Sequence, residues 1–181
     1  MEYIISFPKI EHLEQLVQLN RKFLINNLSP EQREKGFIRI KYSKEDFERI
    51  ITNQEIVVAF NFEDVVAYYM IGRISSTKKL DYQKNIAKKV AEKFNYIEDR
   101  IGYGCQVCID KDFRHYGLFK NMLIALTSKL DTKYDFLLCS ISDNNIASLK
   151  AHKKNGWEFV DKNETTNFFL YDILKNRENI I

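Results

Sequence analysis

The chain has 181 residues and a mass of 21.5 kDa, with 28 basic and 25 acidic side chains, a formal net charge of +3 and 45% hydrophobic residues. This composition excludes a disordered chain and a collagen-like repeat, and so mild a charge does not indicate a nucleic-acid-binding domain. No stretch approaches the roughly 18 apolar residues of a membrane span, and the start, MEYIISFPKI, reads as a strand rather than a signal peptide.

The first part of the chain predicts a strand, three helices and a hairpin. Ser29 begins a helix with Pro in its first turn and Gln three residues on, and Ser43 stands at a similar helix start. The link Asn61-Phe62-Glu63-Asp64 joins two β-prone runs into an antiparallel hairpin. The expected elements are strands at 2–6, 55–60 and 65–72, and helices at 9–24, at 29–36 and from 43 onwards.

Residues 75–100 differ in character and are interpreted as a helical insertion. The segment is rich in Lys, and Ile86, Val90 and Phe94 are spaced four apart on one helical face. This pattern is typical of a solvated helix that packs its apolar side on the domain. Two other interpretations remain open, a flap over an acceptor site that selects an anionic substrate and a nucleic-acid-binding helix.

After the insertion, strands and helices alternate. The amphipathic pattern over 117–130 predicts a helix, and Asp143 is expected to cap a second one that ends at Asn155-Gly156. The order predicts one α/β domain over residues 1–181. The expected elements are strands at 101–109, 134–140, 157–160 and 166–174, and helices at 117–130 and 143–155.

The turn after strand 101–109 has the features of an anion site. A helix N-terminus offers unpaired N–H groups and the positive end of a dipole, which together suit a phosphate. Gly117 lets a phosphate approach the backbone, and the planar cation of Arg114 can pair with it. Arg-x-x-Gly alone is more typical of an ordinary strand-to-helix turn with a surface Arg.

The surrounding motifs resemble the GNAT superfamily of acetyl-CoA-dependent N-acyltransferases. A Val-x-Ile-x-x-x-x-Arg-x-x-Gly-Leu segment is followed by an amphipathic helix, an apolar strand and an Asn-x-x-Ser-x-x-x-His-x-x-x-Gly-Trp helix. Phe119 stands where the family usually has Gly or Ala, and Tyr103 stands where several histone-type members carry a catalytic Glu. The resemblance implies a mixed, mostly antiparallel central sheet flanked by helices. The matching helix positions are Asn145, Ser148, His152, Gly156 and Trp157.

The same resemblance implies a site for acetyl-CoA. The pantetheine arm is expected along strand 101–109, and Asn145 is expected to face it, because Asp143 is already available as a helix cap. His152 stands where many members place a Tyr near the sulfur, so it is a candidate proton donor to the leaving thiolate, with Tyr103 as another candidate. The alternative for His152 is a packing histidine. The backbone groups expected to hold the cofactor belong to Val107, Cys108, Ile109, Arg114, His115, Tyr116, Gly117 and Leu118.

The cysteines do not indicate a metal or a disulfide framework. Cys105 and Cys108 are three apart on a strand, so they point to opposite faces, and no matching second pair exists. An odd number of thiols favours a reducing compartment, most simply the cytoplasm. We therefore expect no metal.

The predicted function is transfer of an acyl group, most simply acetyl, from CoA to a primary amine. The partners are then acetyl-CoA and an amine acceptor of unknown identity, without nucleic acid or membrane, and a homodimer stays open. One alternative is a non-catalytic acyl-CoA-binding regulatory module, because strand 101–109 contains no carboxylate. A nucleic-acid-interaction protein is a third reading, which the near-neutral charge argues against.

Overall fold

The computed structural model describes residues 2–73, 81–95, 97–130 and 132–178, and the chain divides into two compact units. The first unit comprises Met1–Met70 with Gln106–Ser128, and the second comprises Ile71–Cys105 with Lys129–Ile181. Neither unit is continuous in sequence, because two long strands run through both. Whether the chain is one domain over residues 1–181 stays a prediction.

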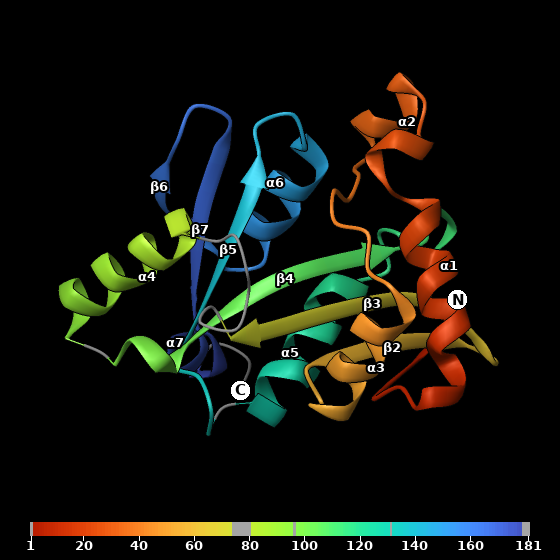
Figure 1. The fold of residues 1–181 in the computed structure, drawn as a ribbon, viewed down its shortest axis with the longest axis horizontal. Helices are drawn as coiled ribbons and strands as arrows, with labels where there is room; N and C mark the ends of the chain where they lie inside the picture. The colour runs from red at the N-terminus through yellow and green to blue at the C-terminus, as the bar shows by residue number, and fades with distance from the viewer. Residues whose placement is uncertain (1, 74–80, 96, 131, 179–181) are drawn as a thin grey trace. The chain divides into compact units, whose positions relative to one another are not determined.

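The described residues form a seven-stranded sheet in the order β1-β2-β3-β4-β5-β7-β6 (Figure 1). β4 and β5 are parallel, whereas the pairs β1–β2, β2–β3, β5–β7 and β6–β7 are antiparallel. The predicted α/β class with a mixed, mostly antiparallel sheet is thus confirmed. The strands are β1 (Ile4–Ser6), β2 (Ile56–Asn61), β3 (Asp64–Arg73), β4 (Ile101–Ile109), β5 (Phe136–Ser142), β6 (Glu158–Lys162) and β7 (Thr166–Asp172).

The helices follow the predicted pattern with one addition at the C-terminal end. The strand expected at 166–174 ends at Asp172, because its carboxylate accepts the backbone N–H of Lys175 at 2.9 Å and so caps a further helix. Both predicted capping residues, Ser29 and Ser43, accept a backbone N–H three residues on. The helices are α1 (Leu13–Lys22), α2 (Pro30–Glu34), α3 (Lys44–Thr52), α4 (Asp81–Phe94), α5 (Leu118–Leu130), α6 (Ile146–Lys154) and α7 (Ile173–Glu178).

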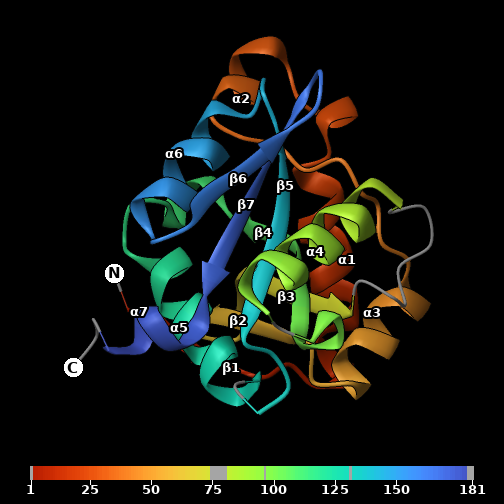
Figure 2. The ribbon, with the colours of Figure 1, turned by 90° about the vertical axis from the view of Figure 1, so that its left-hand side faces the viewer.

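In the first unit, helices cover both faces of the sheet. Successive side chains of a strand point to opposite faces, and Tyr68 and Tyr69 of β3 are both buried. The Tyr68 ring packs edge-on against Phe47 of α3 at 5.7 Å, and the Tyr69 ring lies 5.6 Å from Phe119 of α5. α1 and α3 therefore lie on one face and α5 on the other, as Figure 2 shows.

A buried polar network ties the segment before α3 to the core of the first unit. The Asn20 amide donates to the Tyr68 hydroxyl at 2.9 Å, to Gln106 Oε1 at 2.9 Å and to the Ile40 carbonyl at 3.1 Å. In return, the Asn20 carbonyl oxygen accepts the Tyr42 N–H at 3.2 Å. Because buried polar groups are costly unless they are paired, this network holds the chain around Ile40 in one conformation.

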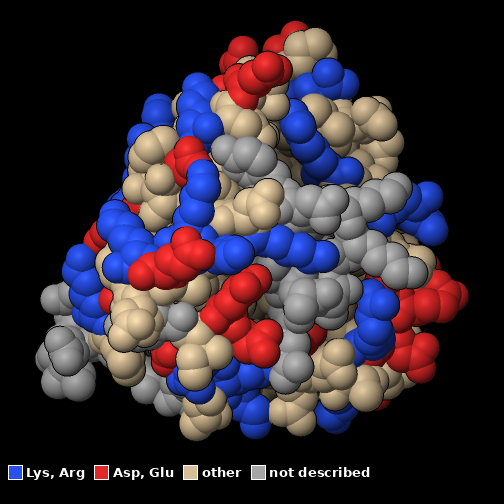
Figure 3. All heavy atoms as spheres, turned by 60° about the vertical axis from the view of Figure 1, so that its left-hand side comes forward, with Lys and Arg blue, Asp and Glu red and all other residues tan. Residues whose placement is uncertain are grey.

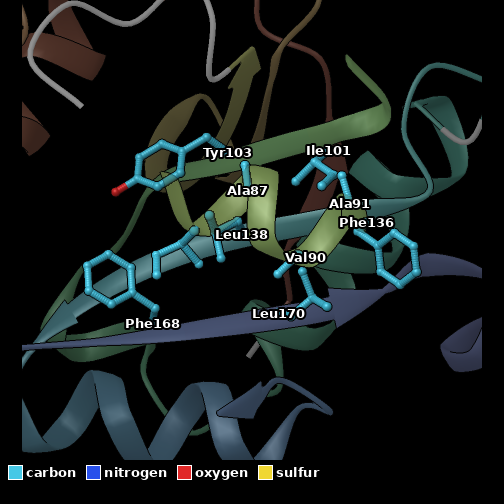
Figure 4. Packing of buried hydrophobic residues seen from close by; sticks show 10 residues of the cluster. Ala87, Val90, Ala91, Ile101, Tyr103, Phe136, Leu138, Phe168 and Leu170 are labelled. Atoms are coloured by element: carbon cyan, nitrogen blue, oxygen red, sulfur yellow. The ribbon is translucent and has the colours of Figure 1, made fainter. Parts of the chain in front are cut away.

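In the second unit, α4 packs on one sheet face as an amphipathic helix (Figure 4). Ile86 and Val90 are buried, as their spacing predicted, whereas Phe94 is 43% exposed and stacks on Phe136 at 5.9 Å. The part of the predicted insertion at 75–80, with Lys78 and Lys79, lies outside the described residues. The α4 side chains in the cluster are Ile86, Ala87, Val90 and Ala91, and the sheet side chains are Ile101, Tyr103, Phe136, Leu138, Phe168 and Leu170.

The outer side of α4 carries its lysines. Lys88, Lys89 and Lys93 are exposed, and the Lys89 ammonium lies 3.8 Å from the carboxylate of Asp161 on β6. Figure 3 shows basic and acidic side chains intermixed on the face that it presents. This arrangement matches the packing interpretation of the helix.

Within the described residues, every helix is too short or too polar to cross a bilayer.

Candidate cofactor site

The loop before α5 carries backbone donors that nothing in the described chain accepts. Asp110 accepts the Phe113 N–H at 3.0 Å, and Lys111 accepts the Arg114 N–H at 3.5 Å. Beyond Arg114, the backbone N–H groups of the next four residues have no acceptor among the described residues. The first three precede a helix of 13 residues and the fourth is its first residue, and the dipole of this helix adds partial positive charge at the same end. These four residues are His115, Tyr116, Gly117 and Leu118.

The loop reaches this shape through two residues with left-handed backbone conformation. His115 has φ +72° and Gly117 has φ +78°. A Cβ at Gly117 would meet only Asn121 Nδ2, at 4.0 Å, so the space above its Cα is open. A side chain there would be strained by the positive φ and would also fill the approach that an anion needs. The loop thus fits a phosphate group.

The guanidinium of Arg114 contacts other groups of the protein. Its Nε donates to the Ile109 carbonyl at 3.1 Å and its Nη1 to the Lys35 carbonyl at 2.6 Å. The guanidinium also lies 5.1 Å from the Phe23 ring centroid. The structure therefore assigns Arg114 an anchoring role at the start of the loop, and direct pairing with a phosphate stays a prediction.

Cys108, in the part of β4 that precedes the loop, does not offer a reactive thiol. Cys108 is 4% exposed, its Sγ lies 3.9 Å from the Leu19 carbonyl, and burial raises the pKa of the thiol to about 12. Val107 and Ile109 are half-buried. Roles of these three residues in holding pantetheine are not tested by the fold and stay predictions.

β4 and β5 pair in parallel over only three residues each, Ile101–Tyr103 with Phe136–Leu138. Within the described chain, the pairing does not continue beyond Tyr103. β5 itself continues to Ser142 beside β7. Where the β4–β5 register ends, the Tyr103 hydroxyl lies 2.5 Å from Ser140 Oγ. Tyr103 is 5% exposed and belongs to the buried cluster that α4 and the sheet form (Figure 4).

Asn145 caps α6, contrary to the expectation that Asp143 would. The Asn145 side chain accepts the Ser148 N–H at 3.3 Å, which is the bond of an N-cap residue. Asp143 lies in the preceding turn, where its carboxylate accepts from Asn167 at 2.6 Å and pairs with Lys162 at 3.1 Å. Asn145 was expected to face the cofactor because Asp143 was expected to be the cap, and that reason is wrong. Contact of Asn145 with the cofactor itself stays a prediction.

His152 is buried and bonded within its own helix. Only 5% of the residue is exposed, its Nδ1 lies 2.8 Å from the Ser148 carbonyl, and its ring lies 5.2 Å from Trp157 in an edge-on arrangement. Burial lowers the pKa of the imidazole to about 4. Since a carbonyl can only accept, the neutral ring carries its proton on Nδ1, and Nε2 is then an acceptor.

The structure divides the predicted site residues between its two units. Val107, Cys108, Ile109 and the loop 114–118 belong to the first unit, and Tyr103, Asn145 and His152 belong to the second. Among the contacts that sequence reasoning missed are that of Lys35 with Arg114 and that of Ser140 with Tyr103. Each joins residues that lie more than 30 positions apart, so no local pattern could have shown it.

No group of three His, Cys, Asp or Glu side chains that could hold a metal ion occurs in the described part of the chain. Of the predicted Cys105 and Cys108 pair, the structure describes the side chain of Cys108 only. The expectation of a metal-free protein stays a prediction.

No protein-family model and no curated protein sequence matches this chain. Solved structures match it over nearly its full length. The PaiA N-acetyltransferase of Thermoplasma acidophilum, described in complex with coenzyme A, is 17% identical, has a TM-score of 0.66, and the match covers 95% of this chain and 99% of that one. A GNAT-family acetyltransferase of Listeria monocytogenes has 11% identity and a TM-score of 0.66, with 95% of each chain covered.

The loading GNAT-like domain of CurA from Lyngbya majuscula is 15% identical, with a TM-score of 0.67 over 97% of this chain and 100% of that one. Identities this low show a shared fold and leave the chemistry to be argued from the residues. The chain therefore has the fold of the GNAT acetyltransferases, as its sequence motifs predicted.

Proposed function

We propose that the chain is an N-acyltransferase that transfers an acetyl group from acetyl-CoA to a primary amine. The observation that carries this proposal is the run of N–H groups at the start of α5 that have no acceptor among the described residues, in a chain with the GNAT fold. One structure with that fold is described with coenzyme A bound. Backbone donors at a helix N-terminus are suited to the phosphates of that molecule.

The residues of this chain have distinct parts in the proposal. The N–H groups of His115–Leu118 bind phosphate oxygens, and Arg114 holds the loop in place. When bound, acetyl-CoA supplies a thioester whose thiolate can leave. The acceptor amine must lose one proton and the thiolate must gain one, so the protein needs a group that can hold or pass a proton.

Of the two predicted proton-transfer residues, we favour Tyr103. Its hydroxyl carries a proton and is already hydrogen-bonded to Ser140. His152 has its proton on Nδ1, donated to Ser148, and its lowered pKa keeps the ring neutral near pH 7. A role for His152 as proton donor stays the prediction from its motif position, and its geometry favours packing. Replacing it by Phe should lower kcat at least about tenfold if it is catalytic and leave kcat unchanged if it packs.

A second candidate function, a non-catalytic acyl-CoA-binding module, rests on a different observation. β4 carries no Asp or Glu, so no carboxylate base lies on the strand that leads into the loop. The same loop would then bind the cofactor for sensing.

One experiment separates the two functions. Calorimetry measures binding of CoA, and a thiol-release screen measures acetyl-CoA turnover with a panel of small amines, amino acids, aminoglycosides and peptides. Transferase function predicts both binding and amine-dependent release, whereas a sensor binds without release. Failure to bind CoA would contradict both functions. The partners proposed are acetyl-CoA and an amine, in the cytoplasm and without nucleic acid or membrane.

A further inference from the structure

The loop that carries the open N–H groups is anchored at two points, and the sequence predicted neither of them. Arg114 fixes the beginning of the loop through the carbonyls of Ile109 and Lys35. The end of the loop is held by Tyr3, which belongs to the N-terminal segment that precedes β1.

The Tyr3 hydroxyl makes two hydrogen bonds there. It donates to the backbone carbonyl of Tyr116 at 3.1 Å and accepts from the side-chain amide of Asn121 at 2.7 Å. Asn121 lies one turn into α5, and its backbone N–H is bonded to the Gly117 carbonyl at 3.1 Å. A single hydroxyl therefore connects the loop to the first turn of the helix.

We propose that Tyr3 is a positioning residue for cofactor binding, which rests on the function proposed above. The Tyr116 carbonyl belongs to the peptide whose N–H is that of Gly117, and a planar peptide turns as one body. Fixing the carbonyl therefore fixes the direction of the Gly117 N–H. Two left-handed residues, His115 and Gly117, flank this point. Glycine adopts this conformation without strain, whereas His115 keeps it only where other contacts hold it.

The consequence is a donor array that is arranged before the anion arrives. Ordering a loop on binding costs affinity, and contacts that order it beforehand reduce that cost. Without its hydroxyl, Tyr3 keeps its ring but loses both bonds, so the loop must be ordered by the ligand. A net hydrogen bond is worth about 0.5–1.5 kcal/mol, which corresponds to an affinity for CoA weakened about two- to twelvefold.

The test is a double-mutant cycle in CoA binding, measured by calorimetry on the full chain. Tyr3→Phe and Asn121→Ala should each weaken binding about two- to twelvefold. Because Asn121 acts through the Tyr3 hydroxyl, the double variant should be no weaker than the weaker single variant. Tyr171→Phe, a hydroxyl deletion in the second unit, is the matched control and should bind like the parent.

The outcomes are distinct. If the parent binds CoA and Tyr3→Phe binds equally well, the positioning role is wrong and the proposed function stands. If the two single effects multiply in the double variant, Tyr3 and Asn121 act separately and the inference is likewise overturned. If the parent itself does not bind CoA, the proposed function fails and this inference fails with it. Turnover adds a further readout, because a positioning role raises KM for acetyl-CoA and leaves kcat unchanged.

Discussion

The loop before α5 and the turn after α6 use the same backbone conformation for opposite purposes. Gly117 has φ +78° and Gly156 has φ +84°. A Cβ on Gly117 would enter open space, whereas a Cβ on Gly156 would lie 2.3 Å from Asn176 Oδ1. Both glycines belong to the motifs that resemble the GNAT superfamily, yet one leaves room for a ligand and the other permits close packing.

The polar groups near the two glycines differ in the same way. The N–H groups of His115–Leu118 have no acceptor in the described chain. On α6, the Asn145 side chain caps the helix and His152 bonds to Ser148 one turn back. Open donors leave a place where a ligand can bind, whereas satisfied groups hold the structure. A motif residue therefore needs its own contacts examined before a function is assigned to it.

The largest expected effect concerns ligand binding at the first glycine. Gly117→Glu adds bulk and negative charge where an anion is proposed to lie, so CoA binding should be lost to calorimetry. The substitution also adds backbone strain of about 1–3 kcal/mol, because φ is positive, so thermal unfolding must confirm that the fold survives.

Gly117→Ala is the control, because it adds the same backbone strain without the charge. Its Cβ has room, with Asn121 Nδ2 at 4.0 Å as the nearest atom, so its CoA affinity should fall less than that of the Glu variant. If the parent and Gly117→Glu bind CoA with equal affinity, the phosphate site does not lie in this loop.

At the second glycine, the effect should be on stability. Gly156→Ala combines a strained positive φ with a contact that forces Asn176 to move, and we expect unfolding free energy to fall by about 2–4 kcal/mol. Denaturant unfolding gives the value. In an Asn176→Ala background the clash is removed and the loss should shrink toward the strain alone, about 1–3 kcal/mol. If Gly156→Ala has the same unfolding free energy as the parent, Gly156 does not pack closely against Asn176.

Acid should destabilise the α6 region through His152. Its pKa is about 4 in the folded chain and about 6.5 when free, so the unfolded chain binds the proton first as pH falls. The stabilisation by the neutral ring is complete above pH 6.5 and is lost between about pH 6.5 and 4. Between pH 7 and 5 the loss should be about 2 kcal/mol.

Urea unfolding of the parent and of His152→Phe at several pH values measures this contribution. The variant lacks the titrating ring, so its stability should change less over the same range. Parallel curves for the two proteins would show that the pKa of His152 is the same in the folded and the unfolded chain, and its role in proton transfer would then regain support.

The smallest expected effect is that of a chelator. Thioester aminolysis needs no Lewis acid, and neither region of the comparison includes a cluster of metal ligands among its described side chains. EDTA should leave CoA binding and any thiol release unchanged. A stoichiometric metal found by elemental analysis in the purified protein would overturn the expectation.

The sequence by itself determined the order of the elements and most of their bounds. Apolar spacing gave α4 and α5 because a helix face repeats every 3.6 residues, and the capping boxes at Ser29 and Ser43 are local patterns of four residues. The GNAT fold was also predictable, because its two motifs depend on short-range spacing around Gly117 and Gly156.

Only the tertiary structure decided which polar residues are open and which are satisfied. From the sequence alone, Asp143 was the expected cap of α6, whereas in the structure Asp143 contacts Asn167 and Asn145 is the cap. Tyr3 meets Tyr116 across 113 positions. Hydrogen bonds between distant segments depend on how strands and helices pack, and that packing is set by the whole chain rather than by any local pattern.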